Sequence, residues 1–102
     1  MNTLNWLQNW YNQNCDGDWE HQYGVSITTI DNPGWSLVID LVYTEFQDLE
    51  IPIQNFDLTE GNWYGYKVSN GKFEAFGDPS KLETLILKFR EIVEQHNTLK
   101  KV

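Results

Sequence analysis

The chain has 102 residues, of which 40 % are hydrophobic and 15 % aromatic, and its formal net charge is −8 at pH 7. That length allows one domain with one core, and the apolar content is too high for an intrinsically disordered chain. No run of about 18 apolar residues is present, which argues against a membrane span, and the first residues do not resemble a signal peptide. A single cysteine, Cys15, excludes an internal disulfide. We therefore expect one cytoplasmic domain over residues 1–102.

The charge is distributed unevenly along the chain. All seven basic residues stand at or after position 67, so residues 1–66 combine ten carboxylates with no Lys or Arg. A segment with this charge should repel nucleic acid, whose backbone is a dense row of phosphates. It could steer a basic partner protein into contact, or it could simply keep the domain soluble.

The first predicted element is a helix over residues 3–13. Thr3 stands where an N-cap side chain would accept a hydrogen bond from the first turn. Leu4, Leu7 and Tyr11 fall on one face of this helix, with Trp6 and Trp10 beside them at i, i+4 spacing, and this apolar face should be buried.

Two alternating segments follow, at 22–30 and 35–41, and each predicts a strand. The segment 31–34 between them holds Pro and Gly, which favour a turn because Pro fixes φ and Gly accepts positive φ. The two strands should therefore pair as an antiparallel hairpin. Their shared apolar face would carry Tyr23, Val25, Ile27, Leu37, Ile39 and Leu41.

The next part of the chain predicts further strands. One short strand is expected near 53–58, although Pro52 indicates an edge or an irregular stretch. Residues 63–68 and 72–76 should form a hairpin, because the Asn-Gly pair at 70–71 is the strongest two-residue turn signal. Consecutive hairpins predict an antiparallel meander.

A final helix is predicted to start with Asp78 at the N-cap and Pro79 at the first helical position. Apolar residues then recur at intervals of three and four up to about Gln95 or His96. The expected fold class is α+β. We predict an antiparallel sheet of about five strands in hairpins, with an N-terminal and a C-terminal helix packed on one face.

Residues 15–21 hold three carboxylates, a histidine and a cysteine within seven positions. Asp16, Asp18 and Glu20 resemble the alternating ligands of a calcium loop, but the twelfth position of that loop would be Ile27 instead of Glu. Zinc would need more ligands than the one Cys and two His of this chain. We therefore expect no metal site and no cofactor.

Catalysis is the second interpretation of this segment, with His21 as a general base beside Glu20 or Asp18 and with Cys15 as a nucleophile. If residues 20–23 are extended, however, Glu20 and His21 point to opposite faces. The sequence also lacks a phosphate-cradling glycine loop, a nucleophile elbow and a dinucleotide fingerprint. We expect that the protein is not an enzyme.

The third interpretation is structural and is compatible with recognition. Trp19 and Trp35 would lie near the outer ends of adjacent strands and pack on Trp6 and Trp10 of the first helix. Asp16, Asp18 and Asp31 would bond to backbone N–H groups of their own turns. A rigid acidic loop would also suit a basic partner. The carboxylates expected at such a contact are Asp16, Asp18, Glu20, Asp31, Glu45, Asp48 and Glu50.

Three strings of residues stand out together: Trp6-Leu7-Gln8-x-Trp10-Tyr11, Cys15-Asp16-Gly17-Asp18-Trp19-Glu20-His21-x-Tyr23-Gly24 and Thr29-Ile30-Asp31-Asn32-Pro33-Gly34-Trp35. They resemble the immunity protein 53 family of bacterial polymorphic toxin systems, densely over residues 6–41 and more loosely beyond. The resemblance implies a small protein that protects the producing cell by binding and neutralising a cognate toxin in a stoichiometric complex. It implies no catalytic residues.

The acidic composition is compatible with a basic, nuclease-like toxin as the partner, because an enzyme that attacks nucleic acid needs a basic cleft for phosphates. The partner would then be a protein, with no binding to nucleic acid or membrane. The alternative interpretation is a small acidic regulatory or housekeeping domain that binds a protein unrelated to toxins.

Overall fold

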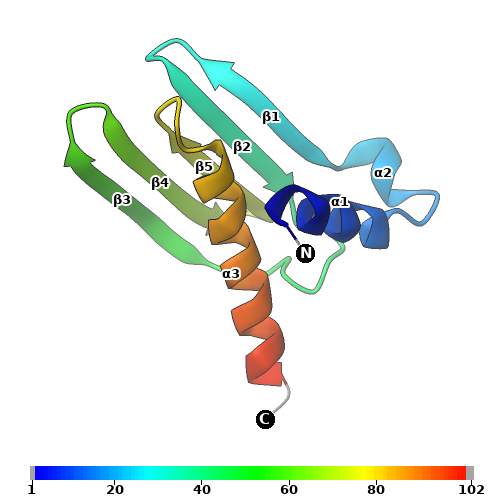
Figure 1. The fold of residues 1–102 in the computed structure, drawn as a ribbon. Helices are drawn as coiled ribbons and strands as arrows, with labels where there is room; N and C mark the ends of the chain where they lie inside the picture. The colour runs from blue at the N-terminus through cyan, green and yellow to red at the C-terminus, as the bar shows by residue number, and fades with distance from the viewer. Residues whose placement is uncertain (1, 101–102) are drawn as a thin grey trace.

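The computed structural model describes residues 2–100, with side chains up to Asn97 (Figure 1). The elements in chain order are α1 (Thr3–Asn14), α2 (Trp19–Gln22), β1 (Val25–Ile30), β2 (Gly34–Asp40), β3 (Ile51–Thr59), β4 (Asn62–Ser69), β5 (Lys72–Gly77) and α3 (Leu82–Lys100). The predicted α+β fold with a five-stranded antiparallel sheet is confirmed. Within residues 2–100, no helix combines the length and the apolar character that crossing a membrane requires.

The strands lie side by side in the order β1-β2-β5-β4-β3, so the prediction of a simple meander is wrong. The hairpin β1–β2 and the meander β3–β4–β5 are joined by antiparallel pairing of β2 with β5. Residues 41–50 carry the chain from the end of β2 across to the edge strand β3 (Figure 1). This order places β2 and β5, which bear the most buried side chains, at the centre. Pro52 stays on an edge, as predicted for a residue that cannot donate to a neighbouring strand.

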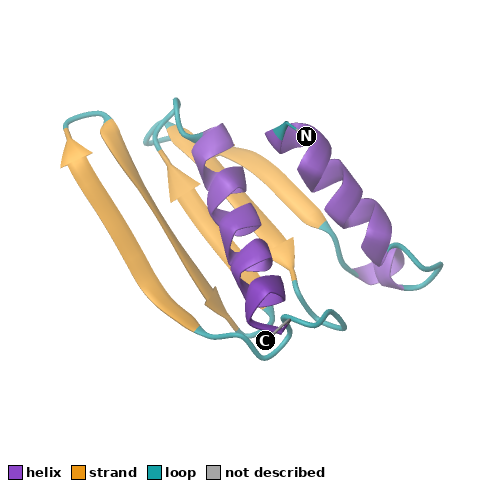
Figure 2. Ribbon diagram, turned by 60° about the horizontal axis from the view of Figure 1, so that its bottom comes forward, coloured by secondary structure: helices purple, strands orange, loops and turns teal. Residues whose placement is uncertain are grey.

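Both long helices cover the same face of the sheet, as predicted (Figures 1 and 2). Phe89 of α3 lies at the centre of the core, with ring centroids 5.1 Å from Phe73 on β5 and 4.9 Å from Trp10 on α1. The β1–β2 register sets Ile27 opposite Leu37, so the predicted hairpin face is confirmed where the strands pair. Aromatic rings thus supply much of the buried area of a short chain.

The two predicted turns use glycine differently. Asn70 and Gly71 have φ values of 54° and 73°, the pair of positive angles that a type I′ hairpin turn requires. In the turn that precedes β2, the peptide bond before Pro33 is cis. Gly34 does not have a positive φ; glycine is required there because the neighbouring strand leaves no room for a side chain. A Cβ at Gly34 would overlap the carbonyl oxygen of Gly77 on the neighbouring strand β5.

The N-terminal helices differ from the prediction in three places. The predicted apolar face of α1 is only partly buried, because Leu7 and Trp10 are buried whereas Leu4 and Tyr11 are exposed. Asn2, not Thr3, caps α1, because its side-chain oxygen accepts a hydrogen bond from the Asn5 N–H at 2.8 Å. Residues 19–22 form the helix α2, so the expectation of an extended chain over 20–23 and of a strand from position 22 is wrong. The strand β1 begins only at Val25.

The last helix also differs at both ends. It begins at Leu82, so Asp78 is not its N-cap and Pro79 is not its first residue. The backbone N–H of Lys81 instead donates to the Asp78 carbonyl oxygen, which makes a separate turn before the helix. At the other end, α3 continues through His96 to Lys100.

Candidate functional site

The seven carboxylates predicted as contacts lie at two ends of the sheet. Six of them stand in the segments that precede β1 or follow β2, beside the β4–β5 turn. Asp31 stands in the β1–β2 turn at the opposite end, and the seven residues of β2 separate the two ends by roughly 20 Å. We call the first region the acidic end; it comprises Asp16, Asp18, Glu20, Asp40, Glu45, Asp48 and Glu50.

The loop between α1 and α2 is held by two of its own carboxylates. Asp16 Oδ1 accepts hydrogen bonds from the N–H groups of Trp19 and Asp18, each at 2.9 Å, and so starts the helix α2. Glu20 accepts from the N–H groups of Asp16 at 3.0 Å and Gly17 at 2.9 Å. The turn chemistry expected at Asp16 is therefore present.

These bonds change the titration of both groups. The N–H groups of Trp19 and Asp18 hold the pKa of the Asp16 carboxyl below its usual range. The N–H groups of Glu20 itself, Asp16 and Gly17 do the same for the pKa of Glu20. Asp16 and Glu20 consequently stay charged in mildly acidic solution, and both hold the loop through these bonds.

Two further carboxylates of the acidic end hold backbone in place. Asp40 Oδ2 accepts a hydrogen bond from the Gly24 N–H at 2.9 Å, which holds the residue before β1 against the end of β2. Glu50 accepts from the Ser69 hydroxyl at 3.1 Å and from the Asn70 N–H at 3.3 Å, which fixes the β4–β5 turn.

Asp18 and Asp48 are exposed, and neither side chain has a hydrogen bond or ion pair with any residue that the structure describes. The Asp31 side chain, at the far end of the sheet, is also exposed and has no such bond. The turn bonds expected for Asp18 and Asp31 therefore do not form among the described residues. Glu45 is exposed as well. Asp18 and Asp48 are thus the carboxylates of this end most available to a partner.

Trp19 ties the acidic loop to the crossover after β2. Its indole N–H donates to the Val42 carbonyl oxygen at 2.9 Å, and its ring lies 6.2 Å from that of Trp10 on α1. The side chain is only 4 % exposed, so the predicted packing of Trp19 on the first helix is confirmed, whereas the indole N–H of Trp35 donates to Pro79 at the other end of the sheet. A buried indole with a satisfied N–H gives both segments a fixed relative position.

Tyr43 is a residue of this end that sequence reasoning missed. Its side chain is 79 % exposed, and its φ of 63° is rare for a residue with a Cβ. Gln47 holds this conformation by accepting the Tyr43 N–H at 2.7 Å. One surface hollow is bounded by Tyr43 with Asp16 and Asp18, and the adjoining one by Tyr43 with Glu45. No pattern in the sequence signals an exposed ring at this position.

The basic side chains pair elsewhere. Salt bridges join Lys67 to Glu74, Lys81 to Asp78, Lys88 to Glu91 and Arg90 to Glu94. None of these four carboxylates belongs to the acidic end. These four salt bridges therefore leave the carboxylates of Asp18 and Asp48 without a cation among the described residues, although the first two-thirds of the chain pack closely on the last third.

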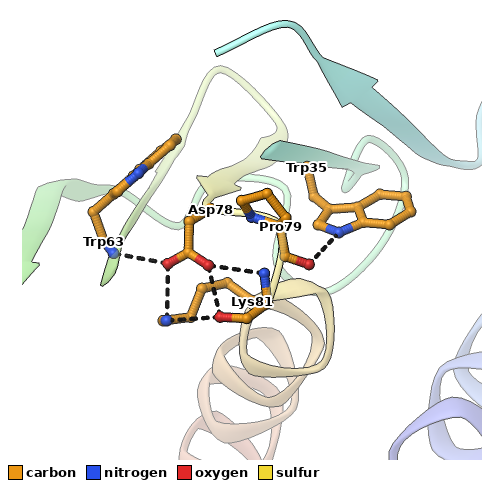
Figure 3. Close-up of polar contacts among 6 residues, drawn as sticks. Trp35, Trp63, Asp78, Pro79 and Lys81 are labelled. Carbon is orange, nitrogen blue, oxygen red and sulfur yellow. Dashed lines mark hydrogen bonds and ion pairs between the residues drawn. The ribbon is translucent and has the colours of Figure 1, made fainter. Parts of the chain in front are cut away.

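The opposite end of the sheet holds a buried carboxylate of another kind (Figure 3). Asp78 is 1 % exposed, and its Oδ2 accepts from the Trp63 N–H and from the Lys81 ammonium, each at 2.8 Å. Its Oδ1 accepts from the N–H and the hydroxyl of Ser80. Lys81 above all, and then Ser80, hold the pKa of Asp78 well below its usual range. Beside it, the indole N–H of Trp35 donates to the Pro79 carbonyl oxygen at 2.9 Å.

The residues considered for metal or catalytic chemistry are placed as follows. The Cys15 thiol donates to the Tyr11 carbonyl oxygen at 3.3 Å, and His21 is exposed on α2. In the part of the chain that the structure describes, no three His, Cys, Asp or Glu side chains are grouped so that they could hold a metal ion.

Comparison with known proteins gives one match. A family model described as immunity protein 53 matches residues 4–94, which cover most of the chain and include α1, the whole sheet and most of α3. No curated protein and no solved structure matches. The chain belongs to the immunity protein 53 family.

Proposed function

We propose that this chain neutralises a cognate bacterial toxin by forming a stoichiometric protein complex through its acidic end. It would act in the cytoplasm as a single binding domain, without catalysis. The family supplies the immunity role. The observation that supports the location is the surface hollow that Asp18 shares with the exposed Tyr43, together with the exposed Asp48 on the same crossover; neither carboxylate has a partner among the described residues.

The physical argument rests on the composition of this surface. Tyr side chains are enriched where a few residues carry most of the binding energy, because they bury a large area with few rotatable bonds. Carboxylates around such a ring raise the rate of encounter with a positively charged partner. Tyr43 would be the anchor, and Asp18, Glu45 and Asp48 would steer and orient the toxin.

A surface of this composition should bind a basic protein. A nuclease-like toxin fits, because its active cleft must attract phosphates, and a row of carboxylates would compete for the same positive groups. The same charge disfavours direct binding of nucleic acid to this end.

A neighbouring gene that encodes a toxin domain would supply the partner, and co-expression with that toxin domain tests the proposal. Cells should survive induction of the toxin only when this chain is present, and purified components should elute as a complex of fixed stoichiometry. A toxin domain inactivated at its catalytic residue is the control for expression burden. Cells that die with or without this chain would contradict the proposed function.

Salt dependence tests the electrostatic part separately. Raising the salt from about 0.01 M to 0.15 M shortens the Debye length from about 30 Å to about 8 Å, so the association rate with the toxin should fall steeply. Dissociation should change little. An association rate that stays constant over this range would leave toxin binding intact but would reject steering by the acidic end.

A further inference from the structure

The two edges of the sheet are protected to different degrees. The outer strand β3 carries Pro52, and its pairing with β4 is interrupted by bulges between Ile51 and Gln54 and between Asp57 and Thr59. Such features prevent an edge from accepting another strand. The hydrophobic side chains that β3 exposes, Ile53 and Leu58, stand in these two bulges.

The other edge, β1, has no such protection. Its six residues, Val25–Ile30, include no proline and no charged side chain, and they pair with β2 in continuous register without a bulge. The four residues between its ends are all exposed. An edge strand that is regular, uncharged and exposed is a template for an additional strand.

The hydrogen-bonding pattern identifies the groups that would receive it. The Asp40 N–H donates to the Gly24 carbonyl oxygen at 3.0 Å, and bonded and non-bonded pairs alternate along an antiparallel ladder. Residues 26, 28 and 30 therefore bond to β2. The N–H and C=O groups of Val25, Ile27 and Thr29 point outward, away from the sheet.

Exposed apolar side chains accompany this edge on the helix face. Ile27 is 40 % exposed and Tyr11 of α1 is 38 % exposed, and the Tyr11 ring lies above Gly24 at the start of β1. Leu4, seven residues before Tyr11 and so on the same side of α1, is 57 % exposed. A strand added to β1 would cover Ile27 with its side chains on this face.

Carboxylates stand at both ends of the same edge. The loop with Asp16 and Asp18 precedes β1, and Asp31 follows it directly. We propose, on the basis of the function proposed above, that an extended segment of the toxin adds to the sheet along β1. The segment is about six residues long, uncharged and β-branched in its centre, with Lys or Arg at both ends. This binding mode engages Asp31 and the acidic end at once, although roughly 20 Å separates them.

A toxin segment fits this edge better than a second copy of the chain does. Two copies would each bring a net charge of −8, and the carboxylates at the ends of β1 would face those of the other copy. Like charges brought together in this way disfavour pairing. A basic segment turns the same arrangement into an attraction.

Residue-resolved amide hydrogen exchange tests the proposal with the same toxin domain. In the free chain the amides of Val25, Ile27 and Thr29 should exchange fast, and those of Ser26, Thr28 and Ile30 slowly. In the complex the first three should slow by about tenfold or more. If they exchange as fast in the complex as in the free chain, the proposal is wrong while the immunity role stands. Concentration-dependent protection in the free chain would assign the edge to a second copy and overturn the toxin as occupant.

The substitution Thr29→Pro removes one outward N–H and no bond to β2. It should weaken toxin binding by about tenfold or more while leaving the circular dichroism spectrum unchanged. Thr29→Val, which keeps the N–H, should bind like the unaltered chain. Equal affinities of the two variants would reject strand addition. If the unaltered chain neither binds the toxin nor rescues cells, the proposed function fails and this inference fails with it.

Discussion

The two ends of the sheet use the same residue type in opposite ways. At one end Asp78 is buried, and its two oxygens are bonded to Trp63 on β4 and to Ser80 and Lys81 in the turn before α3. At the other end the carboxylates of Asp18 and Asp48 are exposed, with no bond to any described residue. A buried carboxylate must be satisfied by the fold, whereas an exposed one keeps its hydration and remains available. The contrast separates the carboxylates that build this domain from those that can bind.

The acidic end also rests on buried structure, and Trp19→Ala should have the largest effect on stability. Loss of the indole would open a cavity between α1 and the crossover and leave the Val42 carbonyl without its donor. The free energy of unfolding should fall by about 3–5 kcal/mol, measured by urea denaturation. Trp35→Ala is the control, because that side chain is only half-buried and should lose less. Equal losses would mean that the acidic loop is not anchored by Trp19.

The role of Asp78 is tested by Asp78→Asn, which keeps the shape and removes the charge that Lys81 compensates. The variant should melt at a lower temperature than the unaltered chain at pH 7. Because the pKa of Asp78 is lower in the folded than in the unfolded state, its stabilisation is complete above the unfolded pKa of about 4 and is lost as the pH falls below that.

The melting temperature of the unaltered chain should therefore fall between pH 5 and pH 2, to which Asp16 and Glu20 also contribute. Asp78→Asn should flatten this fall, whereas Asp57→Asn, at an exposed position on β3, should not. A fall that is equally steep in both variants would assign the acid sensitivity to other carboxylates.

Charge reversal at the acidic end should act on binding alone. The double variant Asp18→Lys and Asp48→Lys should weaken toxin binding by about tenfold or more, mostly in the association rate. Its free energy of unfolding should stay within about 0.5 kcal/mol of the original, because neither side chain has a partner to lose among the described residues. The matched control is Asp57→Lys with Glu60→Lys, the same change of charge on and beside β3. If both double variants weaken binding equally, net charge and not the acidic end is what matters.

Tyr43→Asn should not lower the stability of the domain but should clearly lower its affinity for the toxin. Asn adopts the left-handed conformation more easily than Tyr, so the free energy of unfolding should stay equal or rise by up to about 1 kcal/mol. The affinity for the toxin should fall, because the exposed ring is lost. A variant that is less stable but binds normally would show that Tyr43 serves the fold.

Local patterns predicted the parts of this fold that neighbouring residues decide. The alternation of Val25 and Ile27, the Asn70-Gly71 turn and the apolar face of α3 all appear in the structure where the sequence indicates them. The prediction failed at 19–22, where the Asp16 side chain accepts the N–H of Trp19, the first residue of a helical turn. It also failed at Asp78, whose oxygens bond to strand β4 and Lys81 before the helix begins.

The sequence by itself determined the fold class, the excess of carboxylates over the first 66 residues and the resemblance that the family match confirms. These follow from periodicity, composition and local strings. Only the tertiary structure decided that β2 pairs with β5. In the resulting sheet, six of the seven predicted carboxylates lie at one end and Asp31 lies at the other. That pairing depends on how Leu37 and Ile39 fit against Ala75 and Phe73, residues more than thirty positions apart, so no local pattern could report it.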